Sequence, residues 1–302
     1  MAMATILFIS PHLDDAVFSC AGAILKAAAR GDRPVIATVF SHGSDHAKRR
    51  EEDQHAAALL GAEAVWLGYL DVPDRSAAYC DFEAIIFGQA AEDVTLPAQV
   101  ADSLNELITE FQPSVIYAPI AVGTHIDHRI CFDAIAQVQT VAERRFYEDR
   151  PYSYAAGAAE LRLHELGFRS ALIHQGRLLA GFRRLPYVRA FLPVGDERRH
   201  CESLLLAPLN KPPVDDLPPS IITPYAAAET TAAHEAAAAY SSQFAAFCGS
   251  AADLRRRDSH HARRLGFRRP RAERYWTLPA HFPKTTIQDR FHSMLEPQNP
   301  RP

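Results

Sequence analysis

The sequence lacks the features that mark a membrane-spanning, secreted or disulfide-stabilised protein. No apolar run approaches the roughly 20 residues that a membrane-spanning helix needs. The first residues contain no basic segment followed by an apolar stretch and a small-residue cleavage site, so we expect no secretory signal. Only five cysteines occur in 302 residues, and they are scattered and odd in number, which favours reduced thiols over a disulfide framework or a zinc cluster. These absences predict a cytoplasmic protein.

A strong charge of either sign is also missing. The formal net charge is −4, which gives no argument for a nucleic-acid or membrane partner. The basic stretch at residues 255–274 lacks the aromatic interleaving of a nucleic-acid site, and we interpret it as a solvated surface or a subunit contact. We therefore expect a small-molecule partner, no nucleic acid and no membrane, and the sequence leaves a homo-oligomer open.

What the sequence does contain is a regular alternation of strands and helices. Hydrophobic residues make up 48% of the chain and charged residues 23%, as in ordinary globular domains. Strands are predicted at residues 5–9, 34–40, 64–69, 114–118 and 145–149, and helices at 15–30, 45–60, 97–111 and 128–143. Because these strands are apolar along their whole length, we expect a mostly parallel sheet with helices on both faces. The predicted class is therefore α/β and Rossmann-like, with strand order 3-2-1-4-5.

The most informative stretch is Ser10-Pro11-His12-Leu13-Asp14-Asp15, which directly follows the first predicted strand. It places an imidazole and two adjacent carboxylates at the carboxyl end of that strand, where open parallel sheets bind ligands. The amino terminus of the following helix stabilises negative charge, which favours an ionised Asp15. Taken alone, the carboxylates could instead cap the helix. We interpret the stretch as one half of a metal site.

The second half follows the fourth predicted strand, where His125, Asp127 and His128 cluster before a helix. If the first and fourth strands are neighbours, both loops reach one crevice. Two imidazoles and one carboxylate leave coordination positions open for water, as in catalytic zinc sites. The same ligand types also hold iron in oxygenases, although the alternating strands and helices argue against that alternative by analogy of fold.

Adjacent carboxylates in a turn diverge, so they can do different work. We assign Asp15 to the metal and Asp14 to the role of general base. Of His125 and His128, one is expected to bind the metal and the other to face the substrate's oxyanion or leaving group. Asp127 could orient an imidazole, as carboxylates beside metal ligands commonly do.

These motifs resemble those of the LmbE-like (PIG-L-type) metal-dependent N-deacetylases. The resemblance is carried by Pro11-His12-Leu13-Asp14-Asp15 and by His125-Ile126-Asp127-His128, in that order. Four further stretches are similar: Arg49-x-x-Glu52, Leu67-Gly68-Tyr69-Leu70-Asp71, Tyr147-Glu148-Asp149-Arg150-Pro151-Tyr152 and Tyr240-Ser241-Ser242-Gln243. The resemblance covers residues 4–153 and continues more faintly to 276.

The resemblance implies zinc, or another divalent metal, bound by His12, Asp15 and His128. It implies that Asp14 is the general base. It also implies that His125 steadies the tetrahedral intermediate or protonates the leaving amine, with Asp127 tuning it.

Arg49 and Asp71 would contact the substrate by the same resemblance. From the residues alone, Arg49 could equally lie on a solvated helix face, and Asp71 could simply end a strand in a turn.

The domain organisation follows from where the regular pattern ends. Residues 1–153 are predicted to form the Rossmann-like metal-binding catalytic core, with an insertion at 71–96 over the active site. Residues 154–302 are predicted to form a C-terminal extension that packs on the core and contains a helix near 226–247. Within this extension, the proline-rich residues 208–224 predict an extended connection.

We therefore expect a zinc-dependent hydrolase that removes an N-acetyl group from an amino sugar or an amino-sugar-bearing small molecule. One alternative is an amidase or deacylase that acts on a non-sugar metabolite or natural product. The other, from a different class, is a non-catalytic metal-binding protein on the same fold.

Overall fold

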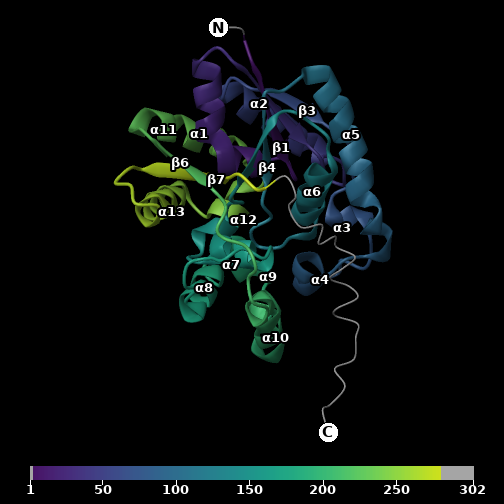
Figure 1. The fold of residues 1–302 in the computed structure, drawn as a ribbon, viewed down its shortest axis with the longest axis vertical. Helices are drawn as coiled ribbons and strands as arrows, with labels where there is room; N and C mark the ends of the chain where they lie inside the picture. The colour runs from purple at the N-terminus through teal and green to yellow at the C-terminus, as the bar shows by residue number, and fades with distance from the viewer. Residues whose placement is uncertain (1–2, 280–302) are drawn as a thin grey trace.

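A seven-stranded sheet runs through the computed structural model, which describes residues 3–279 (Figure 1). Its strands are β1 (Thr5–Ser10), β2 (Arg33–Thr38), β3 (Glu63–Trp66), β4 (Val115–Pro119), β5 (Glu143–Tyr147), β6 (Ser220–Tyr225) and β7 (Arg271–Trp276). The strand order is β3-β2-β1-β4-β5-β7-β6. Strands β1 to β5 are parallel, so the α/β class and the predicted order 3-2-1-4-5 are confirmed.

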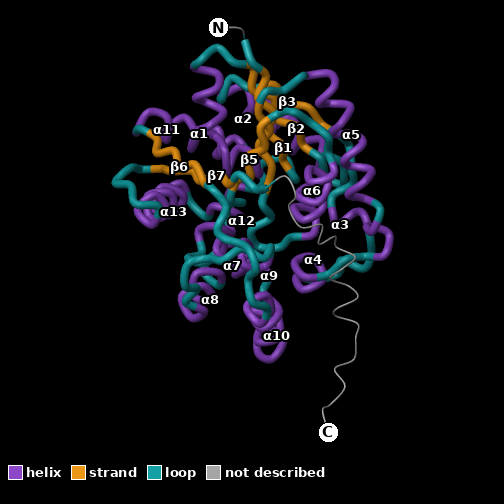
Figure 2. The backbone as a smooth tube through the Cα atoms, in the orientation of Figure 1, coloured by secondary structure: helices purple, strands orange, loops and turns teal. Residues whose placement is uncertain are grey.

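Helices cover both faces of the sheet (Figure 2). In chain order they are α1 (Asp15–Ala29), α2 (His46–Leu59), α3 (Val72–Arg75), α4 (Phe82–Phe87), α5 (Leu96–Phe111), α6 (Ile126–Gln137), α7 (Ala158–Glu165), α8 (Gln175–Phe182), α9 (Pro186–Phe191), α10 (Gly195–Leu206), α11 (Ala227–Ala239), α12 (Phe244–Cys248) and α13 (Ala251–Arg264). Short 3-10 helices lie at Ala91–Val94 (η1), Tyr152–Tyr154 (η2) and Ala207–Asn210 (η3). Helices α1, α2 and α11 pack on one face, and α5 and α6 on the other.

The first strand shows why its sequence is apolar throughout. Side chains alternate between the two faces of a strand. Leu7 and Ile9 pack into the core on the side of α5 and α6, whereas Ile6 and Phe8 pack into the core on the side of α1 and α11. Since both faces of the strand are buried, all four positions between Thr5 and Ser10 are apolar.

The largest difference from the predicted elements lies between α6 and β5. Helix α6 ends at Gln137 rather than near residue 143, because Val138 already has an extended backbone (φ −68°, ψ 134°). Strand β5 consequently begins and ends two residues before the predicted 145–149. The shift leaves Glu148 and Asp149 beyond the strand, at the edge where the site lies.

Two strands from the C-terminal part of the chain extend the sheet. Strand β7 pairs antiparallel with β5, and β6 pairs antiparallel with β7. The proline-rich residues 208–224 thus include most of an outer strand, a position that tolerates proline. Residues 280–302 of the predicted extension lie outside the described residues.

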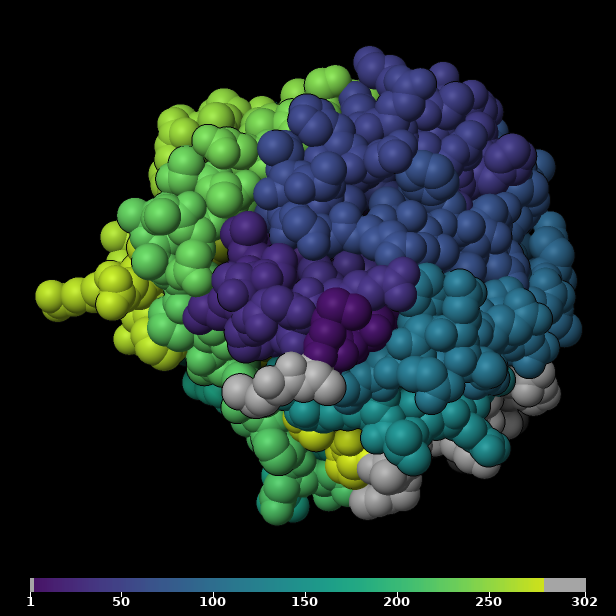
Figure 3. All heavy atoms as spheres, turned by 90° about the horizontal axis from the view of Figure 1, so that it is seen from above, coloured from purple at the N-terminus to yellow at the C-terminus, as the bar shows by residue number. Residues whose placement is uncertain are grey.

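The C-terminal part also packs directly on the first helix. Viewed from above, light green residues lie beside the purple start of the chain (Figure 3). A Cβ atom at Gly22 of α1 would lie only 2.3 Å from the Tyr225 ring of β6, so only glycine permits this approach. The predicted helix near 226–247 is present as α11 and α12, which are separate helices joined by residues 240–243.

Within residues 3–279, none of the helices combines the length and the apolar character that crossing a bilayer requires.

Candidate functional site

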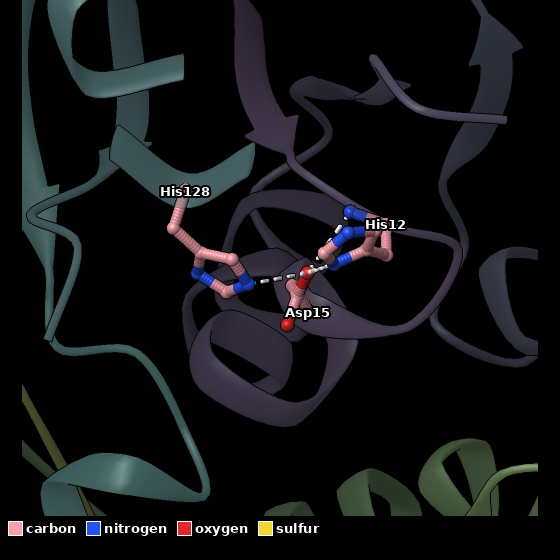
Figure 4. Close-up of side chains that lie close together, drawn as sticks. All are labelled: His12, Asp15 and His128. Carbon is pink, nitrogen blue, oxygen red and sulfur yellow. Dashed lines mark hydrogen bonds and ion pairs between the residues drawn. The ribbon is translucent and has the colours of Figure 1, made fainter. Parts of the chain in front are cut away.

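Two loops at the carboxyl ends of neighbouring strands bring the predicted ligands together. Strands β1 and β4 pair directly. The loop after β1 supplies His12, and the helix that follows begins with Asp15. The loop after β4 leads into α6, whose first turn carries His128. These three side chains point toward one another (Figure 4).

The geometry of the trio fits one metal ion. The Nδ1 atom of His12 lies 3.0 Å from Oδ2 of Asp15, and Nε2 of His128 lies 3.3 Å from the same oxygen. One ligand atom from each residue lies within 4.8 Å of the others. Two nitrogens and one oxygen, with further positions open, match the donor set of catalytic zinc.

The electrostatics of His12 indicate a site built for positive charge. Its Nε2 atom lies 3.1 Å from Oδ2 of Asp127 and 3.4 Å from Oδ1 of Asp71. Although burial works to lower the pKa of His12, Asp71, Asp127 and Asp15 together raise it well above its ordinary value. Three carboxylates therefore surround a single imidazole. A divalent cation bound beside it would balance their negative charge.

Asp149, just beyond β5, orients His128, and the sequence analysis gave it no role. Its Oδ1 atom lies 2.7 Å from Nδ1 of His128, while its Oδ2 accepts the backbone N–H of Val122 at 2.8 Å. A proton on Nδ1 leaves Nε2 with a free lone pair toward Asp15. This carboxylate–imidazole arrangement fixes the tautomer and ring orientation of metal-binding histidines. The available sequence signal was an acidic residue at the same edge of the sheet as both motifs.

Replacing Asp149 with asparagine is expected to weaken binding of Zn²⁺ by about 10–100-fold. The side-chain volume stays the same, but His128 loses the negative charge that holds its Nδ1 proton. Competition with a metal-sensitive dye measures the affinity. The matched control is Asp102→Asn, which changes an exposed carboxylate on α5. Equal affinities in wild type and D149N would rule out this role.

Asp14 differs from Asp15 in having no assigned partner. It occupies the N-cap position of α1, but its side chain makes no capping hydrogen bond. Its Oδ2 atom is buried without a hydrogen-bond partner among the described residues. Burial and the adjacent Asp15 carboxylate raise the pKa of Asp14 to about 7. The helix-cap alternative therefore does not account for Asp14, whose free oxygen is available to accept a proton.

His125 is held in one neutral form. Its Nδ1 atom accepts the backbone N–H of Asp127 at 3.2 Å, which places the ring proton on Nε2. Burial and the neighbouring imidazoles of His12 and His128 lower the pKa of His125 well below its ordinary value. The ring lies edge-on to that of His12, with 4.9 Å between centroids. His125 can thus offer an N–H donor to a group in the site.

The loop that presents His125 has an unusual backbone. Ala121 and Thr124 have φ of 65° and 59°, in the left-handed region that residues with a side chain seldom adopt. Such strain persists where surrounding contacts impose it and is concentrated at functional sites. Here the Val122 N–H bond to Asp149 is one of those contacts.

The carboxylate of Asp127 faces His12, whereas its backbone N–H, rather than its carboxylate, contacts His125. Its Oδ1 atom accepts a hydrogen bond from Arg75 at 2.5 Å. Arg75 also forms two bonds of 2.9 Å with Asp93. The segment 71–96 therefore reaches into the site through Arg75, which the sequence analysis did not single out.

Arg49 and Asp71 meet at the rim of the site. The Nη1 atom of Arg49 donates to Oδ2 of Asp71 at 3.1 Å, and His46 Nε2 lies 3.3 Å from the same oxygen. Asp71 also caps α3 through the N–H of Val72. His46 is buried, with 4% of its surface exposed. The structure thus joins the two predicted substrate contacts to His12 through Asp71.

Comparison with known proteins gives a family match and a curated relative that are both named for deacetylation. Residues 7–139 match a family model described as PIG-L: GlcNAc-PI de-N-acetylase. A 2'-N-acetylparomamine deacetylase from Streptomyces fradiae is 30% identical over 172 residues, which are 51% of this chain and 60% of that protein. This chain therefore spans less than two thirds of that relative's length.

Solved structures with the same fold include the A40926 pseudoaglycone deacetylase Dbv21 (TM-score 0.64, 19% identity, 94% of this chain and 100% of that chain). A deacetylase of teicoplanin biosynthesis has TM-score 0.64 and 21% identity, over 90% of this chain and 96% of that chain. The N,N'-diacetylchitobiose deacetylase from Pyrococcus horikoshii has TM-score 0.52 and 17% identity, over 95% of this chain and 88% of that chain. At these identities the similarity establishes the fold.

Proposed function

From the premise that residues 7–139 belong to the PIG-L family, we propose that this chain is a metal-dependent N-deacetylase. The family indicated by the sequence motifs is confirmed. The observation that carries the proposal is the convergence of His12, Asp15 and His128 beside a buried, partnerless Asp14 oxygen. Metal ligands alone would suit many roles, whereas a free carboxylate beside them suits hydrolysis.

His12, Asp15 and His128 would hold the metal, and their donor set favours zinc. A divalent ion bound there would acidify water and polarise the acyl carbonyl. Among relatives of this fold, one structure is of a zinc-inhibited teicoplanin deacetylase, Orf2.

Each remaining residue of the site has a proposed task. Asp14 accepts the proton of the attacking water through its free oxygen. His125 donates its Nε2–H to the acyl oxygen as negative charge develops, a role that its neutral tautomer supports better than protonation of the leaving amine. Asp127, held by Arg75, orients His12 rather than His125. Arg49 and Asp71 contact polar groups of the substrate at the rim.

The proposed substrate is an N-acetylated amino sugar or a small molecule that carries one. The curated relative is named for 2'-N-acetylparomamine, and the family model for an N-acetylglucosaminyl compound. A fluorescamine assay of amine release from 2'-N-acetylparomamine and from N-acetylglucosamine tests the proposal. Metal binding without amine release from a wider panel of N-acetyl compounds would support the non-catalytic alternative. Oxygen consumption by iron-loaded protein would support the oxygenase.

Removal of the metal is expected to abolish amine release and to leave the fold intact. Dialysis against a chelator should reduce turnover to background, and one equivalent of Zn²⁺ should restore it. Circular dichroism should change little, because the sheet and its two cores are formed by residues away from the ligands. Full turnover in protein shown by elemental analysis to be metal-free would contradict a metal-dependent reaction.

A further inference from the structure

Tyr152 lies against the loop that carries His125. It begins η2, a short turn beyond β5, and its ring covers Gly123 of the β4–α6 loop. A Cβ atom at position 123 would lie 2.2 Å from Cγ of Tyr152. Gly123 also has φ of +89°, which a side chain would oppose. The glycine therefore leaves room for the tyrosine ring at this place.

The ring of Tyr152 also belongs to the aromatic shell of the metal centre. Its centroid lies 6.1 Å from that of His128, with the two planes at 87°. The His128 ring in turn lies 5.3 Å from that of His125. The Tyr152 ring is thus a direct neighbour of one candidate metal ligand, His128, which in turn neighbours His125.

The hydroxyl of Tyr152 forms no hydrogen bond with the described residues that would stabilise the fold. The residue is 3% exposed, yet its hydroxyl makes no hydrogen bond with any residue of 3–279. Two nearby tyrosines differ: Tyr147 donates to the carbonyl of Ile9 at 2.9 Å, and Tyr154 donates to Asp258 at 2.7 Å. The oxygen is not among the fully buried side-chain atoms that lack a partner, so it is open to a partner from outside the described residues, such as a bound ligand.

The hydroxyl is a donor rather than a base. Burial, followed by the charges of Tyr187, Asp15, Asp149 and Asp14, raises the pKa of Tyr152 well above its ordinary value. The phenol consequently keeps its proton throughout the neutral range.

We propose that Tyr152 is a further catalytic residue, whose hydroxyl donates a hydrogen bond to the acyl oxygen as the acyl carbon becomes tetrahedral. This role rests on the proposed N-deacetylase function. The phenol keeps its proton, and no bond to Tyr152 forms or breaks. A donor fixed in place before the reaction stabilises the charge that develops, and the loss of one such donor costs about 10²–10³-fold in turnover in acyl transfer. Together with His125, it gives the acyl oxygen two donors from this chain.

The decisive variant is Tyr152→Phe, which keeps the ring over Gly123 and removes only the hydroxyl. We expect kcat on N-acetylglucosamine to fall by about 10²-fold, with little change in KM. A second measurement does not depend on turnover. The N-methylphosphonamidate of glucosamine mimics the tetrahedral carbon, and its affinity for the zinc-loaded protein should fall by a similar factor. Calorimetry should show unchanged binding of glucosamine, which lacks the acyl oxygen.

Tyr154→Phe is the matched control. It removes a hydroxyl two residues away that bonds to Asp258, so it should lower the midpoint of urea unfolding without changing the ratio of phosphonamidate to glucosamine affinity. Gly123→Ala is an independent variant, because its methyl group displaces the Tyr152 ring. It should reproduce the selective loss of phosphonamidate affinity.

Unchanged kcat and unchanged phosphonamidate affinity in Y152F would overturn the role of Tyr152. An equal loss of phosphonamidate and glucosamine affinity would overturn it as well, since that pattern marks a general disturbance of the site. If wild-type protein releases no amine from any N-acetyl compound, the proposed function fails. A selective loss of phosphonamidate affinity in Y152F would then still place the hydroxyl beside a tetrahedral oxygen.

Discussion

Replacing Asp14 with asparagine is expected to lower kcat by about 10²–10⁴-fold, the contribution typical of general acid–base catalysis. Asparagine has the same size but cannot accept a proton from water. Asp14 is buried, and its Oδ2 atom is free of hydrogen bonds to the described residues. The variant should therefore fold normally and should lack only the proton acceptor. Steady-state kinetics of amine release measure the effect.

The metal content of D14N shows whether a lower kcat comes from loss of the proton acceptor or from loss of the bound metal. Because Asp14 is not one of the three proposed ligands, D14N should retain the zinc stoichiometry of the wild type in elemental analysis. Asp53→Asn is a matched control. Asp53 is also a buried carboxylate, but it accepts hydrogen bonds from Trp66 and Tyr240, so its loss should affect stability more than turnover. A D14N protein with full activity would remove Asp14 from the mechanism.

Replacing Arg271 with methionine is expected to lower the free energy of unfolding by about 3–5 kcal/mol, the cost of breaking a buried ion pair from one side. Arg271 is 2% exposed. It donates to Asp258 and to Glu273, each at 2.8 Å, and to the carbonyl of Phe18 at 2.6 Å. Methionine fills much of the same volume but leaves both carboxylates without this partner. Urea unfolding at pH 7 measures the difference.

The control for R271M lies two residues earlier. Arg269 is exposed, and Arg269→Met should leave the urea midpoint nearly unchanged. Losses of equal size in both variants would show that the effect comes from basic charge in general rather than from the buried pair.

The pH dependence of R271M provides a further check. Burial alone would raise the pKa of Asp258, but Arg271, Arg150 and His234 hold it well below the ordinary value. A carboxyl group with a depressed pKa stabilises the fold above its unfolded-state pKa of about 3.9 and loses this contribution as the pH falls toward the folded-state value. The stability difference between wild type and R271M should therefore be largest near pH 7 and become smaller below about pH 4.

Arg271 also connects the C-terminal part of the chain to the helix that begins at the candidate metal site. The Phe18 carbonyl, in the first turns of α1, accepts hydrogen bonds from Arg271 and Arg150. Glu273 accepts the backbone N–H groups of Gly22 and Ala23, one turn further along. The ion pair thus fixes α1, and with it the position of Asp15.

The sequence was sufficient for the core of the fold and for the position of the site because both depend on local pattern. Apolar runs separated by helices define parallel strands, and the side chains that follow such strands meet at one edge. His12 and His128 are more than a hundred residues apart, yet this rule alone places them in one crevice.

The buried ionic residues could not be predicted in the same way. Strand β7 reads Arg271-Ala-Glu-Arg-Tyr-Trp, and charged residues at this density are typical of a solvated surface, as we expected for residues 255–274. Their burial depends on Asp258 and Phe18, which are remote partners that local pattern does not reveal. Asp149 and Tyr152 stand in a stretch that resembles the family, but neither was assigned a role from the sequence. For Asp149 the reason is that the predicted strand ran two residues too far and included it.

The position of β7 along β5 sets a lower limit on the size of the folded unit. The family match ends at residue 139, but Phe146 and Tyr147 of β5 form backbone pairs with Trp276 and Tyr275. A protein shortened to its family-matching half would present an open strand edge to solvent, which invites pairing between molecules and aggregation. Attempts to isolate a shorter folded fragment should therefore keep the chain through residue 276.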